Sequence, residues 1–361
     1  MSNPKTDRFI DYDIQNRVMR SPAEEWHPHI AQTDKTMDWW YVTTMLYDTA
    51  GNPYFLFWCD FQFGGQKHID MIPGLADKVK PGQKVFHSIA NLTDYTNQYH
   101  IGDGEITIMD EQDSYDLESN AILYSSPNRS AKWSYDGKKC HLSVRSEIYN
   151  AELDMDNADY IMYAKDHYNV EGFMQEGAED DFSFYWSLPR LNLSGWLSFI
   201  DQNGQHKKID VTGQGWIDRQ WGDFITQSWE WSSLRFTNGA RVNLYNFASG
   251  YQVATYQKAD GTLQWFDHFT VKQNGYLKTP KNNVWVSWGW TYEFPIEIEG
   301  AKSYTGEPYS KLDTVENSAN CFYEGPSRLY NTETGELVGI TINESMGIKI
   351  MRNEPYGPNQ H

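Results

Sequence analysis

Short runs in which apolar and polar residues alternate restrict the fold of this sequence more than any other feature. Such runs occupy residues 39–47, 54–63 and 85–92, and turn-forming pairs that contain glycine separate many of them. Alternation with a period of two is typical of a strand with one face on a core, and helical spacing is scarce. The chain is therefore predicted to be all-β, with antiparallel strands joined by tight turns.

The same pattern continues through the second half of the chain. Tight turns are predicted at Asp136-Gly137, Asn238-Gly239 and Asp260-Gly261, because these pairs readily adopt the backbone angles of a hairpin turn. The first of them lies within a predicted hairpin over residues 132–145. The further predicted strands cover residues 191–200, 229–236, 242–247 and 263–271.

A length of 361 residues suits two ordinary domains or one large β domain. Residues 171–181 are acidic, contain glycine and differ from both flanks. We interpret them as a connection between two β domains, with the boundary near residues 171–188. An acidic surface loop within one domain would have the same composition.

Aromatic residues make up 16% of the chain, with 15 Trp and 24 Tyr. Such side chains favour strands because they fit a pleated, half-buried surface. Most of them are expected to fill β cores, but they also suit a site for polyenes, ring systems or sugars. A hydrophobic small molecule is therefore an expected partner.

The formal net charge of −19 argues against nucleic acid and anionic membrane surfaces as partners. Cys59, Cys140 and Cys321 lie far apart, which predicts neither a disulfide framework nor a zinc site and favours a reducing compartment. Neither a secretion signal nor an apolar run of about 18 residues is found. The expectations are a cytoplasmic protein and no integral membrane segment.

The segment GQGWIDRQWGD at residues 213–223 holds the densest chemistry of the chain. We expect a tight bend that crowds Trp216, Asp218, Arg219 and Trp221 together. A carboxyl group walled by indoles is poorly solvated, which raises its pKa and suits it to donate a proton, whereas an adjacent Arg would keep it ionised. Two interpretations stay open: a functional acid, or a structural Asp218–Arg219 ion pair packed by tryptophans.

Other chemistries find less support. His27 and His29 have no further ligands at metal-binding spacing, and the motifs of nucleotide-binding loops and serine hydrolases are missing. No metal and no cofactor are therefore expected. Asp218 and Glu230 could form the acid pair of a glycosidase, although their spacing does not single them out.

Five stretches stand out in this order along the chain: DWWYV at 38–42, FHSIANLTD at 86–94, LNLSG at 191–195, GWIDRQWG at 215–222, and YEGP at 323–326 with GITINE at 339–344. Together they resemble the hydroxyneurosporene-synthase-like family, which includes carotenoid 1,2-hydratases and AttH-type lipocalin-like proteins. Fungal Diels-Alderases and kievitone hydratase are related. The resemblance implies two lipocalin-like (calycin-type) antiparallel β-barrels packed together, the first over residues 1–185 and the second over residues 186–361. It also implies cofactor-independent chemistry on long hydrophobic molecules.

The resemblance also carries over to single residues. The His and Trp of the hydratases fall on Arg219 and Trp221, and the Tyr of their Tyr-x-Asp falls on Tyr245, followed here by Asn246 and Phe247. Arg cannot act as an acid–base group near neutral pH. The sequence therefore looks closer to the AttH-type branch than to the carotenoid hydratases.

The first functional hypothesis is a cofactor-independent enzyme for an isoprenoid or polyene-type molecule, performing C=C hydration or dehydration, isomerisation or cyclisation. A non-catalytic lipocalin-like carrier for a lipophilic metabolite and a carbohydrate-active β-sandwich are the alternatives. The sequence leaves the substrate and the oligomeric state open. The expected catalytic residues are Asp218, Arg219 and Tyr245, and the expected substrate contacts are Trp40, Trp216, Trp221, Trp229 and Trp231.

Overall fold

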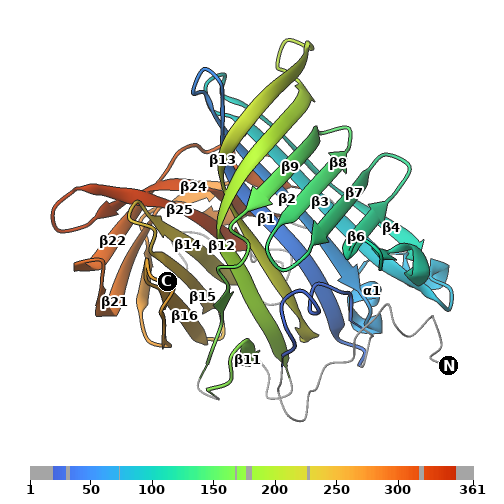
Figure 1. The fold of residues 1–361 in the computed structure, drawn as a ribbon, viewed down its shortest axis with the longest axis horizontal. Coiled ribbons are helices and arrows are strands. Elements are labelled where there is room, and N and C mark those ends of the chain that lie inside the picture. The colour runs from blue at the N-terminus through green and yellow to red at the C-terminus, as the bar shows by residue number, and fades with distance from the viewer. Residues whose placement is uncertain are drawn as a thin grey trace. The chain divides into compact units, whose positions relative to one another are not determined.

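The computed structural model describes residues 19–29, 33–72, 74–166, 169–175, 181–225, 228–316 and 321–346. Strands dominate these residues and pair antiparallel, so the all-β prediction is confirmed (Figure 1). The described helical segments are α1 (Gln66–Asp70), η1 (Ala76–Lys78) and η2 (Glu111–Asp113). None of the described helices has the length and apolar character needed to cross a bilayer.

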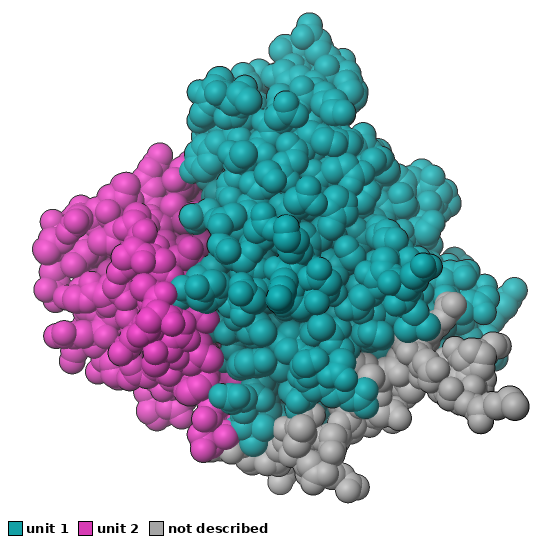
Figure 2. Space-filling model, viewed as in Figure 1, with its two compact units in different colours: residues 1–163, 170–225 teal, residues 164–169, 226–361 magenta. Residues whose placement is uncertain are grey.

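The chain divides into two compact units, shown in teal and magenta in Figure 2. Unit 1 comprises residues 1–163 and 170–225, and unit 2 comprises residues 164–169 and 226–361. The cysteines Cys59, Cys140 and Cys321 are buried.

Unit 1 is built on one large curled sheet. Its strands are β1 (Thr36–Asp48), β2 (Pro53–Phe63), β3 (Gln83–Asp94), β4 (Tyr99–Asp110), β5 (Tyr115–Asp116), β6 (Ala121–Ser125), β7 (Ser130–Tyr135), β8 (Cys140–Arg145), β9 (Asn150–Asp156), β10 (Met162–Tyr163), β11 (Phe173–Gln175), β12 (Phe182–Ile200) and β13 (His206–Asp223). Their order is β4-β3-β2-β1-β13-β12-β9-β8-β7-β6-β5, with β10 and β11 paired to β12. The predicted hairpin about Asp136-Gly137 joins β7 to β8.

Unit 2 repeats this plan with shorter strands. They are β14 (Trp229–Phe236), β15 (Arg241–Phe247), β16 (Gln252–Gln257), β17 (Leu263–Phe266), β18 (Thr270–Gln273), β19 (Tyr276–Lys278), β20 (Trp285–Ser287), β21 (Trp290–Ile298), β22 (Ala301–Pro308), β23 (Thr314–Glu316), β24 (Cys321–Asn331) and β25 (Leu337–Met346). The main sheet has the order β17-β16-β15-β14-β25-β24-β22-β21-β18, with β23 on β24, and β19 pairs with β20. The predicted turns at Asn238-Gly239 and Asp260-Gly261 join β14 to β15 and β16 to β17.

The division into units differs from the boundary expected between residues 185 and 186. That position falls inside β12, which pairs with β13 as far as Ile200 opposite His206. The segment interpreted as a connection contributes β11 to the same sheet. Because β12 and β13 are long and paired with each other, unit 1 continues through residue 225.

Alternating side chains of each sheet form its core. In unit 1, Trp58, Trp133 and Trp186 are almost completely buried, and Trp26 from the N-terminal segment packs among them. In unit 2 the cluster includes Leu234 and Val242. Burial of this apolar area supplies most of the stabilising free energy.

β13 corrects the expectation of a tight bend at residues 213–223. This segment is regular strand, paired with β1 on one side and β12 on the other. Its glycines allow close approach of neighbouring backbone: a Cβ atom at Gly213 would collide with the Met45 carbonyl oxygen, and one at Gly222 with the Phe182 carbonyl oxygen. The glycines are therefore needed for sheet packing.

Replacing Gly213 with Ala is expected to destabilise the protein by about 1 to 3 kcal/mol, because backbone atoms of β1 must shift to admit the methyl group. Urea denaturation of the full chain measures this loss. Gln214→Thr, at the exposed neighbouring position, is the control and should stay within about 0.5 kcal/mol of wild type. Equal stability of the two variants would contradict the close-approach explanation.

Candidate functional site

Alternation along β13 separates the two charged residues of the WIDRQWG motif. Neighbouring strand residues point to opposite faces, so Asp218 shares a face with Trp216 while Arg219 shares the other with Trp221. Arg219 forms its ion pair with Asp38 of β1, at 2.8 Å. The Asp218–Arg219 ion pair considered from the sequence is thus replaced by a pair between two strands.

Asp218 and Trp216 do lie together, as the sequence predicted. The Trp216 indole nitrogen and the Ser187 hydroxyl, the latter at 2.7 Å, both donate to Asp218 Oδ1. Asp218 as a whole is 3% exposed. These contacts give Asp218 a defined structural environment on this face of the sheet.

Arg219 occupies a fully buried position between two of the predicted tryptophans. Its guanidinium lies 4.1 Å from the Trp40 ring centroid and 4.8 Å from that of Trp221. The group has five N–H donors, and its acceptors are Asp38 and the carbonyl oxygens of Glu25, His27, Trp39 and Gln220. Since every donor has an acceptor, Arg219 fixes the N-terminal segment to the strands.

His29 completes this buried charge cluster, which the sequence did not predict. Its imidazole lies 2.9 Å from Glu25 Oε2 and 3.0 Å from Asp38 Oδ1, and it stacks on Trp221. Burial alone would raise the pKa of Asp38, but Arg219 and His29 outweigh it and lower the pKa to about 2. The cluster is therefore structural: it stabilises an ionised carboxylate inside unit 1.

The predicted residues of unit 2 form a separate group. Trp231 lies directly opposite Tyr245 on the neighbouring strand, and Trp229 lies opposite Phe247. The Trp229 indole nitrogen donates to Glu344 Oε2 at 2.8 Å. The structure thus brings Trp40, Arg219 and Trp221 together, pairs Trp216 with Asp218, and pairs Trp231 with Tyr245.

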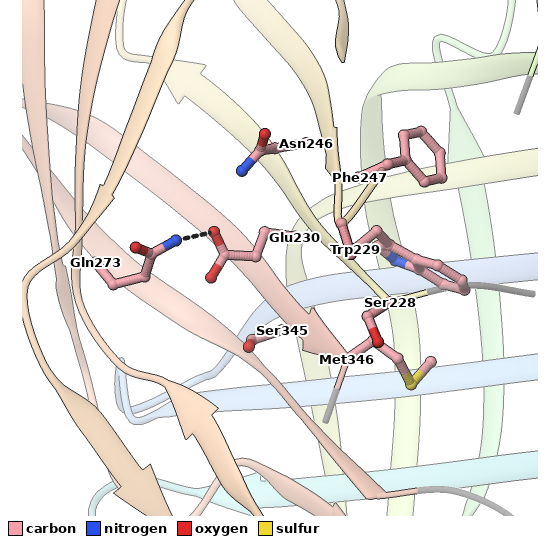
Figure 3. Close-up of a pocket in the computed structure, with 9 residues that line it drawn as sticks. Ser228, Trp229, Glu230, Asn246, Phe247, Gln273, Ser345 and Met346 are labelled. Atoms are coloured by element: carbon pink, nitrogen blue, oxygen red, sulfur yellow. Dashed lines mark hydrogen bonds between the residues drawn. The ribbon is translucent and has the colours of Figure 1, made fainter. Parts of the chain in front are cut away.

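A pocket of about 80 Å³ lies in unit 2 at the start of β14 (Figure 3). Glu230 lies within it, directly opposite Asn246 of β15 and Ser345 of β25. Among the predicted site residues, only Trp229 lines this pocket. The lining residues are Ser228, Trp229, Glu230, Asn246, Phe247, Ala248, Gln273, Ser345 and Met346.

Glu230 is the acid of this pocket. Its side chain is buried, and Oε2 accepts a hydrogen bond from Gln273 Nε2 at 2.6 Å. Burial raises the pKa of Glu230, although Ser287, Gln273, Trp290 and Asn246 favour the ionised form. Glu230 Oε1, Ser287 Oγ and Trp290 Nε1 are all buried, so polar groups gather around the carboxyl group at this point of the pocket. A polar ligand atom or a water molecule would bind here more readily than an apolar one.

From the sequence, Glu230 is a candidate only as the second acid of a glycosidase pair with Asp218. The two residues belong to different compact units. The alternation of residues 229–236 contains a signal that could have singled out Glu230. Glu230 has the same parity as Leu234 and Phe236, which are core positions of the same strand. An acid at a core-facing position of an apolar strand face is a candidate for a perturbed pKa.

Comparisons with known proteins place this fold. A family model described as AttH-like matches residues 18–339. The chain belongs to the AttH-like family. The AttH-type relationship predicted from the sequence motifs is therefore confirmed. A search of curated proteins found no match.

Two crystal structures share the fold of this AttH-like chain. A proposed AttH from Nitrosomonas europaea is 16% identical, with a TM-score of 0.69, and the match covers 91% of this chain and 97% of that one. Kievitone hydratase from Nectria haematococca is 14% identical, with a TM-score of 0.64, and the match covers 94% and 97%. The prediction of two lipocalin-like β domains is confirmed.

The described residues contain no group of three or more His, Cys, Asp or Glu side chains arranged to hold a metal ion. The cluster of Glu25, His29 and Asp38 instead surrounds the Arg219 guanidinium.

Asp38→Asn is expected to destabilise the protein by about 3 to 5 kcal/mol, because it leaves the buried Arg219 without its carboxylate. Since the pKa of Asp38 is lowered, its contribution is present above about pH 4 and is lost as the pH falls through 2. Denaturation midpoints measured across this range test both points. The control Asp154→Asn removes an exposed carboxylate and should change stability little; an equal loss in both variants would contradict the assignment.

Proposed function

We propose that this AttH-like protein is a hydratase that adds water to a C=C bond of a hydrophobic small molecule, with Glu230 as its acid–base group. The observation that carries the proposal is Glu230 itself, a buried carboxyl group with a raised pKa at the wall of a small pocket. A carboxyl group with a raised pKa keeps its proton to higher pH than an ordinary one, which suits it to general-acid catalysis. The shared fold of kievitone hydratase supports the same reaction class by analogy.

One carboxyl group can both supply the proton that the reaction needs and recover it at the end. The protonated carboxyl group gives its proton to one carbon of the C=C bond, whose π electrons form the new C–H bond. The neighbouring carbon becomes cationic, and a water molecule adds to it through an oxygen lone pair. The Glu230 carboxylate then takes a proton from the added water, which leaves an alcohol and restores the acid.

The surroundings of Glu230 suit both halves of this cycle. Burial favours the neutral acid that begins the reaction. Gln273 and Asn246 favour the carboxylate that exists after the proton has left. Donors that are already in place lower the free energy of the charged intermediate without a rearrangement of solvent.

The pocket is sized for the reacting end of a substrate. A volume of about 80 Å³ accommodates a small group and a water molecule, but not a whole polyene. Phe247, Met346 and Trp229 add apolar surface to the lining. The remainder of a hydrophobic substrate would extend away from this pocket.

In this proposal Glu230 has the acid role that the sequence suggested for Asp218. Arg219 has a structural role instead of the expected catalytic one, because its N–H donors are occupied by Asp38 and backbone carbonyl oxygens. The scheme needs no cofactor. The cytoplasmic location stays a prediction, and isomerisation, cyclisation and non-catalytic binding are the other outcomes that the experiments below distinguish.

Incubation of the purified protein with prenylated phenols and isoprenoid alcohols in heavy-oxygen water, followed by mass spectrometry, tests the reaction. The expected product has gained one labelled water. Glu230→Gln should lower turnover by about 10² to 10⁴, while the control Glu297→Gln, on an exposed strand position, should not change it. Binding without any turnover would support the carrier hypothesis and overturn the hydratase, and an isomer of unchanged mass would indicate isomerisation or cyclisation.

In this scheme the protonated form of Glu230 is the active form, and this determines how activity depends on pH. Activity is expected to fall as the pH rises through the pKa of Glu230, which burial raises above that of an ordinary carboxyl group. The alkaline limb of a kcat/KM profile reports this pKa in the free enzyme. A limb at the ordinary carboxyl value of about 4.3 would contradict the assignment of Glu230 as the acid.

A further inference from the structure

A row of polar side chains crosses the sheet of unit 2 at the level of the pocket. In the strand register, Gln252 lies opposite Asn246, Asn246 opposite Glu230, and Glu230 opposite Ser345. Directly opposite residues in antiparallel strands share a face, with Cβ atoms about 4.5 to 5.5 Å apart. The four side chains therefore act on one another although they come from four strands.

The backbone fixes which way the Asn246 amide points. The backbone N–H of Phe269 can only donate, and it donates to Gln252 Oε1 at 3.3 Å. This leaves Gln252 Nε2 to donate to Asn246 Oδ1, at 3.0 Å. Asn246 Nδ2 is consequently the end of that amide which faces the pocket, and Figure 3 shows it on the side of Glu230.

The other neutral groups around Glu230 are also arranged as donors. Ser345 Oγ accepts a hydrogen bond from the backbone N–H of Ser287 at 3.0 Å, which leaves its own O–H available to donate. Gln273 Nε2 donates to Glu230 Oε2 at 2.6 Å. The pocket thus presents amide and hydroxyl donors beside one carboxyl group.

The side-chain amide of Asn246 can donate a hydrogen bond to a ligand. Its amide nitrogen carries two hydrogens, and one of them can be directed at Glu230, which lies directly opposite in the strand register. The second can be satisfied by an acceptor oxygen within the pocket. A hydrocarbon in the same place would leave it unpaired, and sites built to hydrogen-bond an oxygen reject analogues that lack it.

We infer that the pocket recognises a neutral acceptor oxygen, such as a carbonyl oxygen, beside the reacting C=C bond of the substrate. Asn246 Nδ2 donates to this oxygen, and Gln252 is the positioning residue that holds the amide in the donating orientation. The inference rests on the proposed function for its reaction, and it narrows the substrate class from hydrocarbon polyenes to oxygenated hydrophobic molecules. It concerns binding and can be tested without turnover.

Two probes of equal shape test it. Cyclohexanone and methylenecyclohexane differ only in a C=O group against a C=CH₂ group, and both are small. Their dissociation constants are measured by saturation-transfer NMR on the full chain carrying Glu230→Gln, so that no reaction can intervene. Cyclohexanone is expected to bind about tenfold or more tightly than the alkene. Equal affinities, or no detectable binding of cyclohexanone, would overturn the inference.

Variants of the chain identify the side chains that cause the preference for the ketone. Asn246→Leu should abolish the preference for the ketone, and Gln252→Met should reduce it, because Asn246 is then free to turn. Gln264→Met, at an exposed position on the next strand, should leave the preference intact. Circular dichroism checks that each variant is folded, and an unchanged preference in a folded Asn246→Leu variant would overturn the inference.

The proposed function and this inference can fail separately. If the wild-type protein adds water to no substrate but still prefers the ketone, the hydratase proposal fails and the recognition of an acceptor oxygen stands. If it hydrates hydrocarbon polyenes and shows no preference for the ketone, the hydratase proposal stands and the inference fails.

Discussion

In an antiparallel sheet, neighbouring side chains of one strand point to opposite faces, and this constraint decides which groups of the protein can meet. On β13 it sends Arg219 towards Asp38 and Asp218 towards Trp216. On β14 it places Glu230 on the core-facing side, with the parity of Leu234. The chemistry of both units thus follows from the parity of each residue within its strand.

Asp38 and Glu230 are both buried, but their surroundings shift their pKa values in opposite directions. Asp38 has Arg219 within 2.8 Å and remains ionised with a pKa of about 2. Glu230 has only neutral neighbours among its hydrogen-bond donors, and burial raises its pKa. A fully paired charge cluster fixes structure, whereas a buried carboxyl group among neutral donors has a pKa shifted towards the protonated form.

Much of the local structure could be predicted from sequence patterns. The alternation at residues 229–236 matches β14, and the Asn238-Gly239 pair forms the turn to β15. The glycines of residues 213–222 were interpreted as a bend, yet their lack of a Cβ atom serves close approach within the sheet. Glycine marks both turns and crowded backbone, so composition alone could not separate the two.

The sequence by itself determined the all-β class, strands such as β2, β14 and β15, and the relationship to the AttH-like family, because these depend on local periodicity and on contiguous motifs. Only the tertiary structure decided that Arg219 pairs with Asp38, that β12 continues across the expected boundary, and that Glu230 meets Asn246 and Ser345. Those contacts join strands that are distant in the chain. Their register is set by core packing and by close backbone approach over the whole sheet, which no local pattern of residues encodes.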